Sequence, residues 1–129
     1  MTDPISDMLT QIRNALLRRK EEAVLPYSKI KENLGQVLAR QGWVEKVEML
    51  EDGGRKLLKL KLKYEQGTPV ISGLKRVSKP GQRIYAKVSE IPPVKLGFGS
   101  TILSTSKGLM TDKEARKEKM GGELICQIW

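Results

Sequence analysis

The chain has 129 residues, and its 24 Lys and Arg exceed its 15 Asp and Glu by a formal charge of +9. Such an excess points to a polyanionic partner, with nucleic acid as the first choice and an anionic membrane as the second. The length suffices for one domain or for two small ones that share a core. No apolar run approaches the roughly 20 residues that span a bilayer, and the N-terminus lacks the pattern of a signal peptide, so we expect a cytosolic protein.

Two residue types that carry much enzyme chemistry are scarce. The chain contains no histidine, which removes the commonest general base and the commonest metal ligand. Cys126 is the only cysteine, so no internal disulfide can form, and its place in an apolar run favours a buried thiol. These absences argue against a metal site, a cofactor and histidine-based catalysis, whereas catalysis by carboxylates stays open. We expect a non-catalytic protein without metal or cofactor.

The first third of the chain predicts a helix, a short strand and a second helix. Asp3 before Pro4 is typical of a helix start, and an apolar run over 23–26 indicates a strand that ends at its proline. Ser28 is expected to cap the second helix, which stops near Gly42. Apolar residues recur at helical spacing in both helices. They are Ile5, Met8, Leu9, Ile12, Ala15 and Leu16 in the first and Ile30, Leu34, Val37 and Leu38 in the second.

Two basic clusters in the first half each allow more than one interpretation. Residues 18–20 (Arg-Arg-Lys) lie at the end of the first helix. Their charges either interact favourably with the negative C-terminal end of the helix or add an RNA contact. Strands over 43–50 and 56–64 flank a turn at 52–54, and leucines of the second alternate with Lys59, Lys61 and Lys63. This lysine row is a solvated sheet face, protection for an edge strand or a direct nucleic-acid contact.

Residues 66–69 have the composition of a linker, which divides the chain into an N-terminal α+β part, 1–64, and a mainly β part, 65–129. The basic excess is concentrated in one segment. Residues 66–111 hold seven bases and a single acid, Glu90, on a stretch rich in predicted strands and turns.

Tyr85 is the first candidate for a nucleic-acid contact. It lies in the second of two strands, 70–77 and 84–88, that are joined by a turn at 79–81. Arg83 and Lys87 stand two residues to either side, so the three side chains share one sheet face. A tyrosine flanked by cations can stack on a base or pack on a ribose. A core tyrosine is the alternative.

The stretch 97–108, Gly-Phe-Gly-Ser-Thr-Ile-Leu-Ser-Thr-Ser-Lys-Gly, ends in a compact polar tip. A strand over 100–103 leads to three hydroxyls, which can donate and accept hydrogen bonds. Lys107 adds a charge, and Gly108 allows a tight turn or a close approach. Such a tip suits phosphates, ribose hydroxyls or base edges. A polar turn between a strand and a helix is the plainer alternative.

The end of the chain predicts a short helix and a closing strand. Thr111 and Glu114 form a capping box for a charged helix that ends at Gly121-Gly122, and an apolar strand covers 123–129. Glu123 is the unusual residue at a phosphate-binding surface, where it could accept hydrogen bonds from base amino groups or hold the serine tip.

Known nucleotide motifs do not fit the glycine-rich stretch. Lys107 precedes its glycine, unlike the lysine of a Walker loop, and Ile102 breaks a dinucleotide-binding fingerprint. A basic sheet with a tyrosine and a hydroxyl tip suits structured RNA. DNA is less favoured because no basic recognition helix stands out. A small enzyme that uses the glycine loop remains the rival class.

Several motifs closely resemble the signature of the eighth small-subunit ribosomal protein, bacterial type, and the resemblance covers the whole chain. In the second half they are Ser-Thr-Ser-Lys-Gly at 104–108, Met-Thr-Asp at 110–112, Glu-Ala-Arg at 114–116, Gly-Gly-Glu at 121–123, Arg-Val-Ser-Lys-Pro-Gly at 76–81 and Arg-Ile-Tyr at 83–85. In the first half they are Asp-Pro-Ile-Ser-Asp-Met-Leu-Thr at 3–10, Ile-Arg-Asn-Ala at 12–15 and Ser-Lys-Ile-Lys at 28–31.

The resemblance implies an α+β fold of two small parts that pack through their sheets, with helices outside. It also implies a ribosomal protein that binds the central domain of small-subunit (16S) ribosomal RNA early in assembly and helps to organise the platform. The fifth and twelfth small-subunit proteins would be neighbours. In some bacteria the family binds a similar fold in its own messenger RNA and represses translation.

Carried over to this chain, the resemblance implies that most RNA contacts lie in the C-terminal part. The hydroxyl tip would hydrogen-bond RNA, Lys107 would contact phosphate, and Tyr85 would pack on a ribose or base. The predicted RNA-binding residues are Arg76, Arg83, Tyr85, Lys87, Ser104, Thr105, Ser106, Lys107, Gly108, Gly122 and Glu123.

Overall fold

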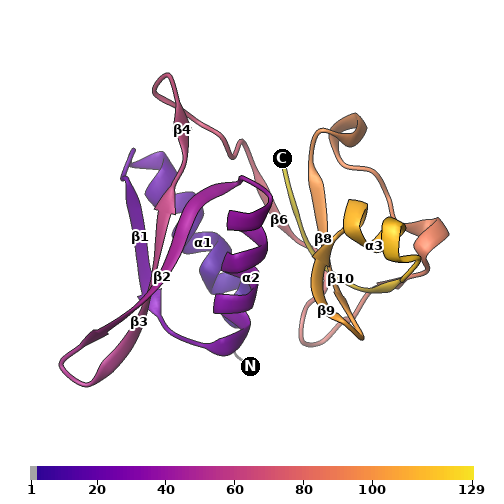
Figure 1. The fold of residues 1–129 in the computed structure, drawn as a ribbon, viewed down its shortest axis with the longest axis horizontal. Coiled ribbons are helices and arrows are strands. Elements are labelled where there is room, and N and C mark those ends of the chain that lie inside the picture. Colours follow the sequence, from indigo (N-terminus) through magenta and orange to yellow (C-terminus); the bar gives the residue numbers. More distant parts are fainter. Residues whose placement is uncertain (1–2) are drawn as a thin grey trace. The chain divides into compact units, whose positions relative to one another are not determined.

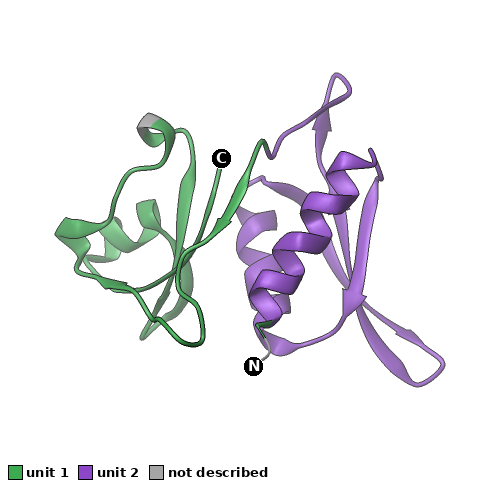
Figure 2. Cartoon of the chain, turned by 180° about the vertical axis from the view of Figure 1, so that it is seen from behind, with its two compact units in different colours: residues 1–3, 72–129 green, residues 4–71 purple. Residues whose placement is uncertain are grey.

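In a computed structural model, which describes residues 3–129 apart from the side chain of Leu96, the chain divides into two compact units. We call residues 4–71 the first unit (purple, labelled unit 2 in Figure 2) and residues 72–129 together with Asp3 the second unit (green, labelled unit 1 there). Each unit combines helices with antiparallel strands, which confirms the α+β class. Within residues 3–129, no helix is long and apolar enough to cross a membrane.

The first unit is built on a three-stranded antiparallel sheet with the order β1-β3-β2 (Figure 1). Its strands are β1 (Glu22–Pro26), β2 (Val44–Asp52) and β3 (Arg55–Leu62). Helix α1 (Pro4–Leu17) packs against β1, and α2 (Lys29–Arg40) packs against β2. The leucines of β3 at 58, 60 and 62 are buried, as their alternation predicts.

Both helices begin and bury their apolar faces largely as the sequence predicts. Helix α1 buries Ile5, Met8, Leu9, Ile12 and Ala15, and α2 buries Leu34, Val37 and Leu38. The Ser28 hydroxyl caps α2 by accepting a hydrogen bond from the Lys31 amide at 3.4 Å. The prediction for Ile30 is wrong, because it lies in the first turn and is 40% exposed, while its neighbour Lys31 is buried.

The lysine row lies on a central strand. Because β3 pairs with β1 on one side and β2 on the other, protection of an edge strand is excluded as the role of these lysines. The Nζ of Lys59 lies 3.0 Å from Glu22 of β1, and the Nζ of Lys61 lies 3.4 Å from Glu45 of β2. The neighbouring strands therefore supply carboxylates that offset part of the row's charge.

Residues 66–69, expected as a linker, belong to a small hairpin of β4 (Tyr64–Glu65) and β5 (Thr68–Pro69). The Tyr64 hydroxyl donates to the carbonyl of Lys20 at 2.6 Å, and the Arg19 guanidinium donates to the carbonyl of Gly67. These two bonds tie the hairpin to the segment after α1, so it is part of the first unit.

The second unit is a sheet with the order β6-β10-β8-β9, in which β7 also pairs with β10. The strands are β6 (Leu74–Arg76), β7 (Tyr85–Ala86), β8 (Ser100–Thr105), β9 (Gly108–Thr111) and β10 (Gly122–Ile128). Strands β6 and β7 pair with successive segments of the same edge of β10, and not with each other. Ser78 stabilises the turn between them, because its hydroxyl contacts both the amide and the carbonyl of Ile84 at 2.8 and 3.2 Å.

One face of this sheet packs on helix α3 (Asp112–Glu118). The buried cluster there is Ile91, Leu103, Met110, Ala115 and Leu124. The predicted capping box of Thr111 and Glu114 is present. The helix ends earlier than predicted, since Lys119 adopts φ 57° and breaks it before the two glycines. Short 3-10 helices, η1 (Val88–Glu90) and η2 (Lys95–Gly97), lie in the segment between β7 and β8.

Candidate nucleic-acid interface

Three predicted residues form a row across the second sheet. Glu123 of β10 pairs with Tyr85 of β7 on one side and with Ser104 of β8 on the other. Directly paired residues of antiparallel strands point to the same face. The next row, Leu124 with Leu103, belongs to the buried cluster under α3. The cross-strand row of Tyr85, Glu123 and Ser104 therefore lies on the sheet face opposite α3.

The glycine pair explains how these strands come so close. A Cβ atom on Gly122 would overlap the carbonyl oxygen of Ser104, and one on Gly121 would overlap the carbonyl oxygen of Ala86. Only glycine fits where backbones approach this closely. Gly121 and Gly122 thus bring β7 and β8 to either side of the start of β10. Gly121 was missing from the predicted site, although its position beside Gly122 was a signal.

Tyr85 is 69% exposed, which rules out the alternative of a core tyrosine. It borders a shallow concavity of about 520 Å³, lined also by Lys87, Val88, Glu90 and the two glycines. Lys87 is exposed. Its backbone amide donates to the Glu90 carboxylate at 3.1 Å, which fixes the chain after β7. The ring therefore has an open face beside a cation, the arrangement that base stacking requires.

Glu123 is paired with Arg83. A guanidinium nitrogen of Arg83 lies 3.0 Å from the Glu123 carboxylate, and this hydrogen bond raises the pKa of Arg83. The Glu123 side chain is only 15% exposed, against 50% for Arg83. Its carboxylate is thus occupied by a neighbouring cation, while its backbone holds β8 at Ser104. The ion pair offsets the negative charge of Glu123 and holds the Arg83 side chain near the strand that carries Tyr85.

The hydroxyl tip is the turn of the β8–β9 hairpin, and not a turn between a strand and a helix. The Thr105 hydroxyl donates to the carbonyl of Gly108 at 2.9 Å and accepts from the amide of Lys107 at 3.1 Å. Gly108 adopts φ 106°, which favours glycine. Thr105 therefore closes the turn, and Ser106, Lys107 and Gly108 are exposed. The Lys107 ammonium lies 3.4 Å from Glu118.

Arg76 lies at the other end of β10, opposite Cys126. Its side chain is 10% exposed, forms an ion pair with Asp3 at 3.1 Å and donates to the carbonyl of Ile125 at 2.7 Å. Ile125 is the residue by which the register of β10 shifts against β8. Arg76 is thus a second donor to this carbonyl at the bulge, which also accepts from the Val77 amide at 3.0 Å. It is not brought together with the other predicted residues.

These features define a small, basic α+β protein whose second unit presents a polar sheet face and an exposed hairpin turn. Such a surface suits contact with another macromolecule. Within the described residues there is no cluster of three or more metal-ligating side chains.

Comparison with known proteins gives the family. The family model of ribosomal protein S8 matches residues 3–129. The small ribosomal subunit protein uS8 of Caldanaerobacter subterraneus subsp. tengcongensis is 55% identical, over 100% of this chain and 98% of its own length. The corresponding proteins of Exiguobacterium sp. and Staphylococcus aureus are 55% and 52% identical over the same shares. The chain belongs to the ribosomal protein S8 family, whose members are structural and not enzymatic components of the ribosome.

Proposed function

We propose that this protein, a constituent of the small ribosomal subunit in the cytoplasm, binds 16S ribosomal RNA directly through its second unit. The contact surface, called the RNA face below, consists of the cross-strand row with the adjacent cations and the β8–β9 turn. Its members are Arg83, Tyr85, Lys87, Ser104, Thr105, Ser106, Lys107, Gly108, Gly122 and Glu123. Arg76 is kept out of it, because its guanidinium is committed to Asp3 and Ile125.

The observation that carries the proposal is the pairing of Glu123 with both Tyr85 and Ser104. It puts an exposed aromatic ring, hydroxyl donors and close-packed glycine backbone on one small surface. An aromatic ring binds an unstacked base, and hydroxyls bind ribose and base edges, which are the groups that structured RNA displays in loops and shallow grooves. Lys87 and Lys107, both exposed, add charges for phosphates.

The proposed target is the central domain of 16S ribosomal RNA, bound early in assembly so that the protein helps to organise the platform. The fifth and twelfth small-subunit proteins are the proposed neighbours. Support for these finer points comes from membership of the family. The same RNA face would also accept a similar fold in the protein's own messenger RNA, which is the regulatory version of this binding chemistry.

A titration tests the proposal. The protein is mixed with a central-domain ribosomal RNA hairpin and with a scrambled hairpin of the same length, each at several salt concentrations. Phosphate contacts alone would give the two hairpins equal affinities, and the logarithm of the affinity would fall linearly with the logarithm of the salt concentration. We expect a preference for the true hairpin that persists at higher salt. Equal affinities at all salt concentrations would reject a shaped RNA site. A fragment of the protein's own messenger RNA that competes with the hairpin for binding to the protein would support the regulatory role.

A further inference from the structure

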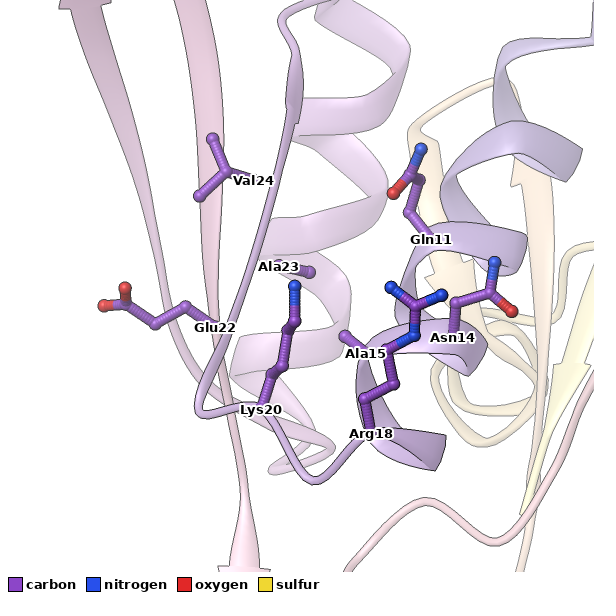
Figure 3. A pocket seen from close by; sticks show the side chains of 8 residues that line it. All are labelled: Gln11, Asn14, Ala15, Arg18, Lys20, Glu22, Ala23 and Val24. Carbon is purple, nitrogen blue, oxygen red and sulfur yellow. The ribbon is translucent and has the colours of Figure 1, made fainter.

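A groove in the first unit has no part in the RNA face. It lies between α1 and β1, has a volume of about 290 Å³ and is called the α1/β1 groove below (Figure 3). Gln11, Asn14 and Arg18 line it from the helix side, at the spacing that puts side chains on one helix face. Residues 22–24 line it from β1. Because three consecutive strand residues point alternately to opposite faces, it must be the backbone edge of β1 that borders the groove.

This edge of β1 is unpaired. The Leu62 amide donates to Glu21 at 2.8 Å, and the Tyr27 amide donates to Lys56 at 3.1 Å. In an antiparallel ladder the bonding groups of alternate residues point to the same neighbour. Residues 21, 23, 25 and 27 therefore face β3, whereas Glu22, Val24 and Pro26 face away. The amides and carbonyls of Glu22 and Val24 have no hydrogen-bond partner within residues 3–129.

Pro26 closes one end of the open edge. Proline has no amide proton to offer a further strand, and its carbonyl accepts a hydrogen bond from the Nζ of the buried Lys31 at 3.0 Å. The groups available for pairing are thus confined to Glu22 and Val24, beside the α1/β1 groove. Two donors and two acceptors alternate there at the spacing of a β-strand.

The charge around this edge is positive. The side chains of Arg18 and Lys20 extend into the space between helix and strand, whereas the Glu22 carboxylate points away from it (Figure 3). That carboxylate is paired with Lys59 at 3.0 Å. Within the described part of the chain, neither Arg18 nor Lys20 has a carboxylate within ion-pair distance. The groove is therefore lined by two cations without a paired carboxylate and by the side-chain amides of Gln11 and Asn14.

We propose that the α1/β1 groove binds an extended peptide segment of another protein, which adds as a strand to the free edge of β1 and places a carboxylate by Arg18 and Lys20. Main-chain hydrogen bonds to Glu22 and Val24 set its register, and pockets for alternate side chains give selectivity. RNA fits less well, because phosphates would accept from the two amides but would be repelled by the two carbonyls.

A blocked five-residue peptide of alternating valine and threonine, with aspartate at its centre, serves as the probe. Amide chemical shifts of the labelled full-length protein report where it binds. We expect the Glu22 and Val24 amides to shift and to become protected from hydrogen exchange. Methylating every peptide nitrogen, which blocks both edges of the extended peptide, or replacing aspartate with lysine, should weaken binding at least tenfold. Equal binding of the methylated peptide would overturn the proposal, as would shifts only outside the groove.

Matched variants make the test sharper. Val24→Pro removes only a donor that faces the groove and leaves the β3 ladder intact, so it should abolish binding, whereas Val24→Ala should bind within about twofold of the parent. Arg18→Glu with Lys20→Glu should weaken the acidic peptide at least tenfold, while Lys117→Glu on α3 should not. If an RNA oligonucleotide shifts Glu22 and Val24 and the peptide does not, the peptide proposal is wrong. The methylated peptide keeps the test decisive even if Val24→Pro fails to fold.

Discussion

Gly122 lies so close to Ser104 that a Cβ atom on Gly122 would overlap the Ser104 carbonyl oxygen. This approach brings β10 against β8 just before Glu123, whose two cross-strand partners are Tyr85 and Ser104. Gly121 approaches the carbonyl of Ala86 in the same way on the other side. The two glycines therefore set the distance between the aromatic and hydroxyl parts of the RNA face.

The glycine contact gives the first prediction. Gly122→Ala should lower the free energy of unfolding by about 1–3 kcal/mol, since it overpacks a backbone contact that cannot relax without separating β10 from β8. It should weaken RNA binding as well. Urea unfolding measures the first effect, with Gly81→Ala as the control, because a Cβ there would meet nothing within 4 Å. Equal unfolding midpoints for the two variants would contradict the prediction, because they would show that a Cβ atom at position 122 fits between β10 and β8.

Thr105 and Ser106 should behave differently although they are neighbours. Thr105→Ala removes the hydroxyl that bonds Gly108 and Lys107, so it should cost about 1 kcal/mol of stability, and Thr105→Ser should restore it. Ser106 is exposed, and Ser106→Ala should change stability by less than about 0.5 kcal/mol.

RNA titrations measure a different property of Ser106, which matters little for stability. Ser106→Ala should lose about 1–3 kcal/mol of RNA-binding free energy if a polar RNA group is left buried without a partner. A folded Ser106→Ala protein with unchanged affinity for the hairpin would remove Ser106 from the RNA face.

The exposed ring of Tyr85 provides a test of stacking. Tyr85→Ala should weaken RNA binding by about 1–3 kcal/mol, or roughly 5- to 150-fold, and should leave the unfolding midpoint nearly unchanged, since the ring is 69% exposed. Tyr85→Phe keeps the ring and should retain most of the affinity. A loss as large for phenylalanine as for alanine would mean that the hydroxyl, and not the ring, makes the contact.

Salt dependence separates the lysines. Lys59 and Lys61 are paired with Glu22 and Glu45, so replacing both with alanine should leave the slope of log affinity against log salt unchanged. Lys87→Ala should reduce that slope by roughly one, as expected for the loss of one phosphate contact. Titrations at four or more salt concentrations measure it. A reduced slope for the Lys59 and Lys61 variant would bring the lysine row into contact with RNA.

Cys126 predicts a pH effect on stability. The residue is fully buried, and this burial raises the pKa of its thiol to about 12, above roughly 8.5 in an unfolded chain. The neutral thiol is favoured on folding, so its contribution is complete below pH ~8.5 and is lost as pH rises toward 12.

The stability of the parent relative to Cys126→Ala should therefore decline from pH 8.5 upward in urea unfolding. A thiol reagent at pH 8 should react only with unfolded protein. Rapid labelling of the native protein would show that the thiol is accessible.

Patterns that depend on nearby residues were predictable from the sequence. The start of α1 at Pro4, the Ser28 cap and the capping box of Thr111 and Glu114 involve groups within one turn of helix, and all three are present. The alternation of leucine and lysine in β3 likewise follows from the pleat of one strand.

The contacts that were missed join distant segments. Arg76 looks like a free cation in the sequence, but its partner Asp3 lies 73 positions away. Thr105 looks like a free hydroxyl, yet it bonds within its own turn once β8 and β9 pair. The placement of β6 and β7 on one edge of β10 also depends on pairing between residues 36 to 54 positions apart, which no local pattern reveals.

The most direct test of the account is amide chemical-shift mapping of the labelled protein with the central-domain hairpin. If the RNA face is correct, the largest changes fall on residues 83–87, 104–108 and 121–123, and they do not appear with the scrambled hairpin at the same salt concentration. Changes concentrated on the lysine row of β3 or at the end of α1, with the cross-strand row unaffected, would contradict the account.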